Sequence, residues 1–168
     1  MKKTIFLSVS IDGFIADKAG IPSFPEGAWE DWCALVNETN SLIAGRTSQK
    51  QVEEIGADAA LTAEHKIVIS SQDLDLSKST WQGAKSPAEA LEILKSKGVN
   101  EVIIGGGRTI VNAFIREGLV DFIIIDLQPV AFGNGTQVFG DFLGRLDLKL
   151  LETSKLNENA IRLKYQVV

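Results

Sequence analysis

The residues best suited to chemistry lie in the stretch Glu101 to Gly118, EVIIGGGRTIVNAFIREG. A short apolar run precedes three glycines, and apolar residues then recur at helical spacing, which predicts a strand, a tight turn and a helix. Glycines lack a β-carbon, so backbone N–H groups at such a turn can approach a ligand closely, and the start of a helix attracts anions. We therefore predict that Gly106, Gly107, Arg108 and Thr109 bind the pyrophosphate of a nucleotide.

The glycine turn has a second interpretation, because strands also turn tightly where the chain packs against a neighbour. The G-x-G-x-x-G pattern of Rossmann domains is not met, since Ile110 stands at the position of the third glycine. Too little chain follows for the further βα units that a Rossmann domain needs. A purely structural turn therefore stays open as the alternative.

Polar residues also follow three other predicted strands. Asp12-Gly13 follows the strand Thr4 to Ser10, and it is either a hairpin turn or a carboxylate at the end of a central strand, where α/β proteins bind ligands. Gly45-Arg46-Thr47 follows a short strand and offers a tight turn, a cation and a hydroxyl that can cap the next helix. Ser70-Ser71 ends another strand, so its hydroxyls either receive a phosphate or only terminate that strand.

The elements that must position these groups alternate between strands and helices. A helix is predicted from Trp29 to Thr39, and its apolar face either packs in the core or presents a tryptophan that stacks on a planar heterocycle. The long loop Lys18 to Gly27 is typical of a lid or a binding loop. Leu119 to Gln128 is nearly all apolar, as in a central strand, and two late strands are predicted to form a hairpin. We predict one α/β domain, residues 1–168, with a mainly parallel sheet.

Composition excludes several classes of protein. The chain has 168 residues, 45% of them apolar, and a formal net charge of -5, which argues against a general nucleic-acid binder. The only cysteine is Cys33 and the only histidine is His65, so neither an internal disulfide nor a Cys- or His-rich metal site is predicted. No apolar run approaches the roughly 20 residues of a membrane span, and the N-terminus is interpreted as a strand rather than a signal peptide. We expect a cytoplasmic protein.

Four stretches of the chain, taken together, resemble the dihydrofolate reductase superfamily. They are Gly45-Arg46-Thr47, Ser70-Ser71-Gln72, the run from Ile104 to Arg108, and Pro129 to Gly133 with Phe139 after it. The stretch Ser10-Ile11-Asp12-Gly13 is similar to the end of the first strand in the reductase domain of riboflavin biosynthesis, the RibD C-terminal domain. The resemblance covers most of the chain.

The resemblance implies a three-layer α/β/α fold of the dihydrofolate reductase type, with about eight mostly parallel strands and a C-terminal antiparallel hairpin. It implies NADPH as the cofactor and a small heterocyclic molecule as the substrate. The residues that it assigns to the cofactor are Gly45, Arg46 and Thr47 at the phosphates, Ser70 and Ser71 at the adenosine ribose with its 2′-phosphate, and Gly105, Gly106, Gly107, Arg108, Thr109 and Ile110 around the pyrophosphate. Asp12 is the candidate catalytic residue, and Gly13 and Trp29 are the candidate substrate-binding residues.

The reaction that the resemblance implies is reduction of the ribosyl group of 5-amino-6-(5-phosphoribosylamino)uracil by NADPH. Two alternatives stay open: reduction of dihydrofolate or another small pterin or carbonyl compound, and NADPH binding without catalysis. The chain departs from the family at two positions, with Phe6 in place of a lysine and Gly105 in place of a frequent glutamate. It lacks the zinc motif of a fused deaminase, and related reductases suggest a homodimer formed through the late strands.

Overall fold

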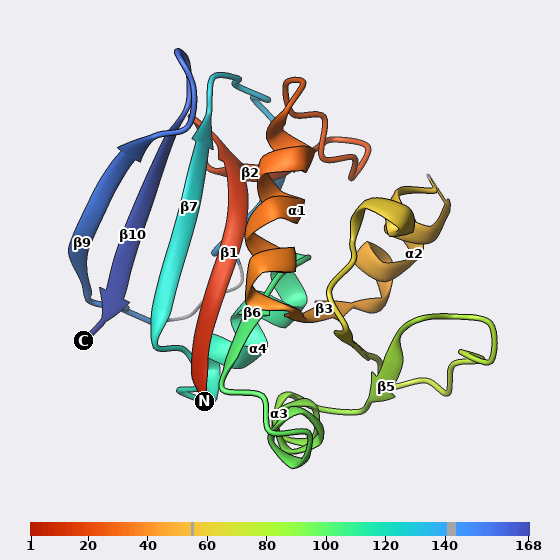
Figure 1. Ribbon diagram of the computed structural model, residues 1–168. Coiled ribbons are helices and arrows are strands. Elements are labelled where there is room, and N and C mark those ends of the chain that lie inside the picture. The colour runs from red at the N-terminus through yellow and green to blue at the C-terminus, as the bar shows by residue number, and fades with distance from the viewer. Residues whose placement is uncertain (55, 141–143) are drawn as a thin grey trace.

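The computed structural model describes residues 1–54, 56–140 and 144–168. A central sheet of eight strands runs through the molecule in the order β5-β4-β3-β6-β1-β7-β10-β9 (Figure 1). The first six strands in this order are parallel, and β10 and β9 run antiparallel to their neighbours. The strands of the sheet are β1 (Lys2–Ser10), β3 (Ser41–Gly45), β4 (His65–Ile69), β5 (Gln82–Ala84), β6 (Glu101–Ile104), β7 (Phe122–Gln128), β9 (Leu148–Lys155) and β10 (Ile161–Val167).

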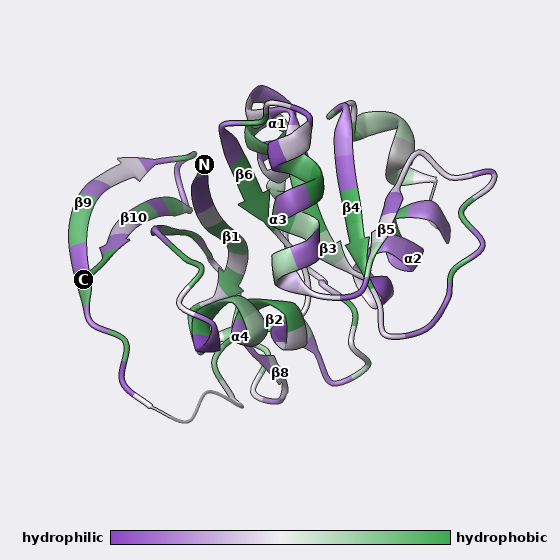
Figure 2. Cartoon of the chain, turned by 90° about the horizontal axis from the view of Figure 1, so that it is seen from below, coloured by the Kyte–Doolittle hydropathy of each residue, from purple (hydrophilic) through white to green (hydrophobic). Residues whose placement is uncertain are grey.

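Helices cover both faces of this sheet and make the fold a three-layer α/β/α arrangement. Residues of α1 (Ala28–Thr39) and α2 (Arg46–Glu54) pack with Phe6 and Leu42 on one face. Residues of α3 (Pro87–Ser96) and α4 (Arg108–Arg116) pack with Ile5 and Leu7 on the other. Alternate residues of β1 thus enter different cores, as the period of a strand requires. Figure 2 shows hydrophobic residues gathered on β4, β6 and α4 and hydrophilic residues along the outer loops.

The structure confirms most of the elements expected from the sequence. The helix α3 begins after a capping serine, since the Glu89 backbone N–H donates to Ser86 Oγ over 3.2 Å and Pro87 occupies the first turn. The late hairpin is present as β9 and β10. The strand predicted from Leu119 begins only at Phe122. The described residues contain no helix that is long and apolar enough to cross a membrane.

One local expectation was wrong, and one open alternative is decided by the structure. The helix α2 starts at Arg46, so Thr47 lies within its first turn and does not precede it as a cap. Asp12-Gly13 is a turn, with the Gly13 N–H donating to Ser10 O over 3.0 Å, but it does not join a hairpin. The strand that follows, β2 (Phe14–Asp17), pairs with β8 (Gly135–Gln137) and not with β1, because the chain leaves the main sheet at this turn. Neither β5 nor β8 is among the strands predicted from the sequence.

Candidate functional site

A cavity of about 610 Å³ lies at the carboxyl ends of the central parallel strands. Its walls come from β1, β3, the turn before α4, the helices α1 and α2, the loop of residues 20–27, and β2 and β8. Parallel strands followed by helices bring such loops and helix starts to one edge of the sheet, where open α/β sheets bind ligands. Most of the lining side chains are apolar or aromatic, which is typical of a small-molecule site.

The glycine turn after β6, for which the sequence analysis predicts a pyrophosphate site, lines this cavity. Gly106 has φ = 108°, a backbone conformation that residues with a side chain rarely adopt. Gly107 is the N-cap residue before α4, and a β-carbon built on it would meet no atom within 4 Å, so its backbone faces open space. The N–H of Thr109 lies in the first helical turn, where no intrahelical acceptor exists. Arg108 also lines the cavity, so the turn combines helix-start donors with a cation.

Not every amide of this turn points into the cavity. The Gly107 N–H donates to Ser48 Oγ over 3.2 Å, and the Gly105 N–H donates to Ile43 O over 2.9 Å as an extension of the sheet. The Ile110 N–H donates to Gly107 O over 3.0 Å, and its side chain is buried against the core. Gly105 and Ile110 therefore stabilise the conformation of the turn through hydrogen bonds and packing inside the protein.

The three residues after β3 differ in their position relative to the cavity. Gly45 is required by packing, because a β-carbon there would lie 2.7 Å from Cγ1 of Ile110. Arg46 is half-buried and is not among the described residues that line the cavity, whereas Thr47 and Ser48 are. The start of α2 therefore faces the cavity through hydroxyl groups.

Ser70 lies at a second, smaller hollow of about 250 Å³ at the ends of β4 and β5. Its hydroxyl accepts a hydrogen bond from the Gln72 N–H over 3.1 Å, so it terminates the strand whether or not it also binds a ligand. Across the hollow, Lys85 Nζ lies 2.5 Å from Oδ1 of Asp73. Ser71 is exposed next to Ser70. The structure therefore separates the predicted adenosine contacts from the main cavity.

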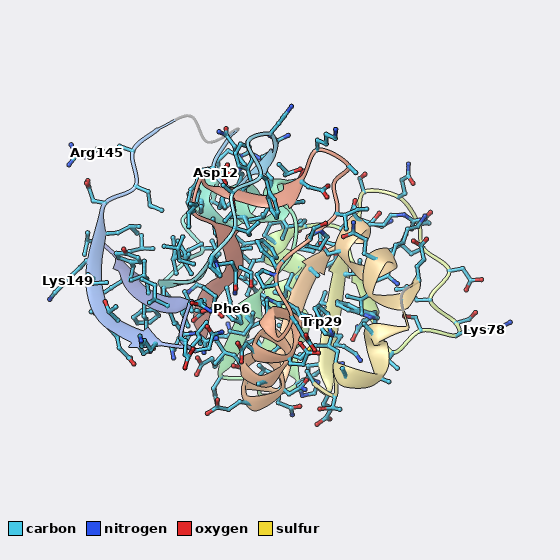
Figure 3. The ribbon with its side chains drawn as sticks, turned by 90° about the horizontal axis from the view of Figure 1, so that it is seen from above. Phe6, Asp12, Trp29, Lys78, Arg145 and Lys149 are labelled. Atoms are coloured by element: carbon cyan, nitrogen blue, oxygen red, sulfur yellow. The ribbon has the colours of Figure 1, made fainter. Side chains whose placement is uncertain are left out.

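An aromatic wall formed by Trp29 and Trp32 lines the α1 side of the cavity. The two indole rings are stacked, with centroids 5.3 Å apart and an interplanar angle of 17°. Trp32 continues the stack to buried Phe6, with centroids 6.3 Å apart, and Figure 3 shows Phe6 and Trp29 on neighbouring elements. A β-carbon on Gly105 would lie 2.6 Å from Cζ2 of Trp32, so the indole ring occupies the space into which a side chain at position 105 would project.

Asp12 lies away from this wall (Figure 3) and is not among the described residues that line the cavity. Its carboxylate accepts hydrogen bonds from Ser10 Oγ over 2.6 Å and from the backbone N–H groups of Phe132 and Gly133 over 3.2 and 2.7 Å. The Ser10 hydroxyl, followed by the Gly133 N–H, holds the pKa of Asp12 below its ordinary value. These contacts fit a carboxylate that anchors a loop. The catalytic role of Asp12 stays a prediction. Substrate binding by Gly13, which has φ = 87°, also stays a prediction.

Several cavity residues were not singled out in the sequence. Ser48, Gln51 and Val52 of α2 line the cavity from one helix face, at the spacing i, i+3, i+4. Gln51 Nε2 also donates to Gly20 O over 3.1 Å and so ties α2 to the loop that covers the cavity. The polar residues of this helix followed a predicted ligand-binding turn, and their common face was the signal that could have identified them. Trp81 and Thr136, which are distant in sequence, gave no such signal.

A buried ion pair lies on the sheet beside the cavity. Asp126 of β7 is fully buried and accepts two hydrogen bonds of 2.7 Å from Nε and Nη2 of Arg162 on β10. Burial raises the pKa of Asp126, and the hydrogen bonds from Arg162 oppose that effect. In the register of β1 and β7, Ser8, which lines the cavity, is the partner of Asp126. Arg162 also lies over the ring of Phe6, 4.9 Å from its centroid.

Comparison with known proteins agrees with this architecture. The family model of the RibD C-terminal domain matches residues 2–161. The uncharacterized protein YyaP of Bacillus subtilis (strain 168) is 24% identical over an alignment of 179 residues, gaps included. The alignment covers 95% of this chain and 91% of that protein. The uncharacterized protein YwjB of the same organism is 24% identical over 183 residues, which cover 98% of this chain and 97% of that protein.

Solved structures show the same fold. A protein of Shewanella sp. PV-4 whose name refers to riboflavin biosynthesis superposes with a TM-score of 0.82 at 25% identity and covers 100% of this chain and 99% of that chain. The diaminohydroxyphosphoribosylaminopyrimidine deaminase/5-amino-6-(5-phosphoribosylamino)uracil reductase of Thermotoga maritima superposes with a TM-score of 0.74 at 14% identity. The match covers 99% of this chain and 56% of the Thermotoga protein, so this chain spans little more than half of that longer protein.

The eight-stranded sheet, its antiparallel C-terminal strands and the glycine turn at its edge define a dihydrofolate reductase-like domain of the riboflavin reductase type, as the resemblance implied. The chain belongs to the RibD C-terminal domain family.

Proposed function

We propose that the protein is an NADPH-dependent reductase that acts on a small heterocyclic substrate in the main cavity. The observation that carries the proposal is the turn from Gly106 to Thr109, whose backbone opens into a cavity that also has an aromatic wall. An anionic pyrophosphate fits the helix-start donors and Arg108, and a planar ring fits beside Trp29. NADPH would thus lie with its pyrophosphate on the turn and its nicotinamide ring facing a substrate ring that lies at Trp29.

The contribution of this chain is to bind and orient the two reactants. NADPH, when bound, supplies a hydride from its nicotinamide ring. The turn and the start of α2 would hold the phosphates, with Thr47 and Arg46 on the α2 side. Ser70, Ser71 and the second hollow would take the adenosine end with its 2′-phosphate. The loop of residues 20–27, tied to α2 by Gln51, lines the cavity and would limit the access of water to the bound reactants.

The first test is binding of NADPH to the wild type and to Gly107→Val. Gly107 has φ = -61° and open space around its β-carbon position, so the variant should fold with an unchanged melting temperature. The added side chain would occupy open space at the turn that lines the cavity, and calorimetry should detect NADPH binding to the wild type only. Equal affinity of the two proteins would contradict the proposal.

The second test is turnover, followed through the absorbance of reduced nicotinamide. The substrates are 5-amino-6-(5-phosphoribosylamino)uracil, dihydrofolate and a panel of small pterins and carbonyl compounds. Turnover of one member identifies the reaction. NADPH binding without turnover of any member would favour the non-catalytic alternative.

Cytoplasmic location and a homodimer stay predictions, and size-exclusion chromatography with light scattering tests the dimer.

A further inference from the structure

A line of planar groups connects the C-terminal strands with the glycine turn. Arg162 of β10 lies over the ring of Phe6, with its Cζ 4.9 Å from the ring centroid. Phe6 stacks with Trp32 of α1, with centroids 6.3 Å apart and an interplanar angle of 12°. The ring of Trp32 packs on Gly105, where a β-carbon would lie 2.6 Å from Cζ2. Since β10 and β6 lie on opposite sides of β1 in the sheet, these contacts join segments that are not direct neighbours.

The guanidinium of Arg162 is held in one orientation. Its Nε and Nη2 each donate a hydrogen bond of 2.7 Å to the carboxylate of Asp126, whose side chain is fully buried. Two such hydrogen bonds fix the plane of a guanidinium, whereas the ammonium of a lysine can rotate and acts as a point charge. The side chain of Arg162 is only 23% exposed, so water weakens its attraction to the ring of Phe6 only in part.

Stability alone is a weak explanation for this ion pair. Burying two charges costs about as much free energy as their attraction contributes, and apolar residues of similar volume often replace a buried pair without loss. The neighbours on the same face of the sheet, Phe6 and Ile124, are buried apolar side chains that would pack well against such a replacement. The orientation that the pair imposes on its surroundings is therefore the better explanation.

Trp32 is the contact between this line of groups and the proposed pyrophosphate site. Its Nε1 donates to Phe6 O over 3.4 Å, and its ring and Leu42 fill the space beside Gly105. Gly105 precedes Gly106, whose φ of 108° directs the chain toward α4. A shift of the indole ring would leave Gly105 without a packing partner, and an unpacked glycine samples many conformations. The amides of the turn would then be less well ordered for a ligand.

Building on the proposed reductase function, we propose that Arg162 is a positioning residue for the pyrophosphate site. Arg162 holds the ring of Phe6, Phe6 holds the indole of Trp32, and Trp32 holds the glycine turn in the conformation that binds the dinucleotide. Arg162 is not among the described residues that line the cavity, so its effect on the ligand is indirect. The C-terminal hairpin thus contributes to cofactor binding through the packing of the sheet.

A variant that lacks the ion pair but keeps the packing tests this role. Asp126→Val combined with Arg162→Met removes both charges and should retain most of the stability of the wild type. We expect calorimetry to show NADP⁺ binding weakened by about two- to tenfold, as for residues that act on a site through others. Lys164→Met is the matched control, because Lys164 is half-buried on the same face of β10. Unchanged affinity in the double variant would overturn the proposal.

The conservative variant Arg162→Lys separates charge from orientation. It keeps a cation beside the buried carboxylate of Asp126 but loses the paired hydrogen bonds that fix the guanidinium plane. We expect its NADP⁺ affinity to lie between those of the wild type and the double variant. An affinity below that of the double variant would overturn the proposal, because the loss would then follow from a misplaced charge.

The stacked indoles give a readout that needs no ligand. The rings of Trp29 and Trp32 lie 5.3 Å apart, and two indoles at this distance give a coupled circular-dichroism signal that depends on their relative orientation. Trp29→Phe identifies the signal by abolishing it. We expect the signal to decrease in the double variant and to stay unchanged in Lys164→Met. An unchanged signal in the double variant would show that the indole keeps its orientation without Arg162, and would overturn the proposal.

A double-mutant cycle tests the route through Trp32. Trp32→Leu alone should weaken NADP⁺ binding, because it removes the ring that packs on Gly105. Adding Asp126→Val and Arg162→Met to this variant should weaken binding no further, since residues that act through one contact are not additive. Additive losses would overturn the route.

The same measurements keep this inference distinct from the proposed function. Absence of NADP⁺ binding by the wild type would overturn the reductase proposal, and the circular-dichroism comparison would still decide whether Arg162 orients Trp32. Normal NADP⁺ binding by the wild type and equal binding by the double variant would overturn only the positioning role of Arg162.

Discussion

Ser48 Oγ accepts a hydrogen bond from the Gly107 N–H over 3.2 Å and thereby joins the start of α2 to the start of α4. The same hydroxyl would lie 2.7 Å from a β-carbon on Gly106, which has φ = 108°. The two contacts hold the glycine turn in the conformation that opens the amides of its neighbours to the cavity. Ser48 therefore acts on the predicted pyrophosphate site by positioning the turn.

Replacing this hydroxyl should weaken NADPH binding. Ser48→Ala removes one hydrogen bond worth about 0.5–1.5 kcal/mol, so we expect the dissociation constant to rise by about two- to tenfold. Calorimetry measures the change, and Ser96→Ala on the exposed part of α3 is the control. Unchanged affinity in Ser48→Ala would show that the turn keeps its shape without this contact.

Asp12 should stabilise the fold in a pH-dependent manner. Hydrogen bonds to its carboxylate lower its pKa from 3.8 in the folded protein. A lowered pKa means that this stabilisation is fully present above the unfolded value, near pH 4, and is lost as the pH falls through the folded value. Asp12→Asn should therefore lower the melting temperature at pH 7 and have little effect at pH 2. An equal loss at both values would contradict the anchoring role.

The anchoring role also predicts an effect on the cavity. Asp12 holds the N–H of Phe132, and the ring of Phe132 packs on Phe24 of the cavity loop, with centroids 5.5 Å apart. We expect Asp12→Asn to raise KM more than it lowers kcat, because it loosens the loop that covers the ligand. A loss confined to kcat would instead support the catalytic role predicted from the sequence.

Replacing only one partner of the ion pair between Asp126 and Arg162 should lower the free energy of unfolding strongly. Arg162→Met leaves the carboxylate of Asp126 buried without a partner, and removal of one partner of a buried pair costs about 3 kcal/mol or more. The double variant Asp126→Val, Arg162→Met removes both charges and should recover most of the loss. Denaturant unfolding measures both variants, and a double variant less stable than the single one would contradict this account.

The pH dependence of Arg162→Met has a definite sign. Burial raises the pKa of Asp126, and without Arg162 nothing in the pair opposes that effect. A raised pKa favours the folded state at low pH and disfavours it as the pH rises. The stability deficit of this variant should therefore be smaller at pH 4 than at pH 8.

Lys85 should distinguish NADPH from NADH if the second hollow receives the 2′-phosphate. Lys85 Nζ is half-exposed beside Asp73 and shares the hollow with Ser70. We expect Lys85→Gln to weaken NADPH binding by about two- to fivefold, as for an exposed ion pair, and to leave NADH binding unchanged. Lys95→Gln, on the exposed surface of α3, is the control. Equal losses for both dinucleotides would place the 2′-phosphate elsewhere.

Local patterns in the sequence were sufficient to predict most helices and strands and the part of the candidate site that the glycine turn forms. The glycines after β6 and the capping residues of α3 have conformational or hydrogen-bonding preferences that act within a few residues. The apolar runs and their periods likewise identified the apolar strands of the main sheet and the face of α1, but not the short strands β5 and β8. These signals predicted the α/β class, and the order of four motifs indicated the family.

Contacts between distant segments were decided only by the tertiary structure. Asp12 precedes Gly133 by 121 positions, and their hydrogen bond exists because β7 lies beside β1. Trp32 meets Gly105 because β1, β6 and α1 converge, and no local propensity encodes that contact. The sequence by itself determined most of the segments that become strands, helices and turns, because those preferences act over short range. The tertiary structure decided which polar groups form hydrogen bonds within the protein and which ones face the cavity, because packing joins residues far apart in the chain.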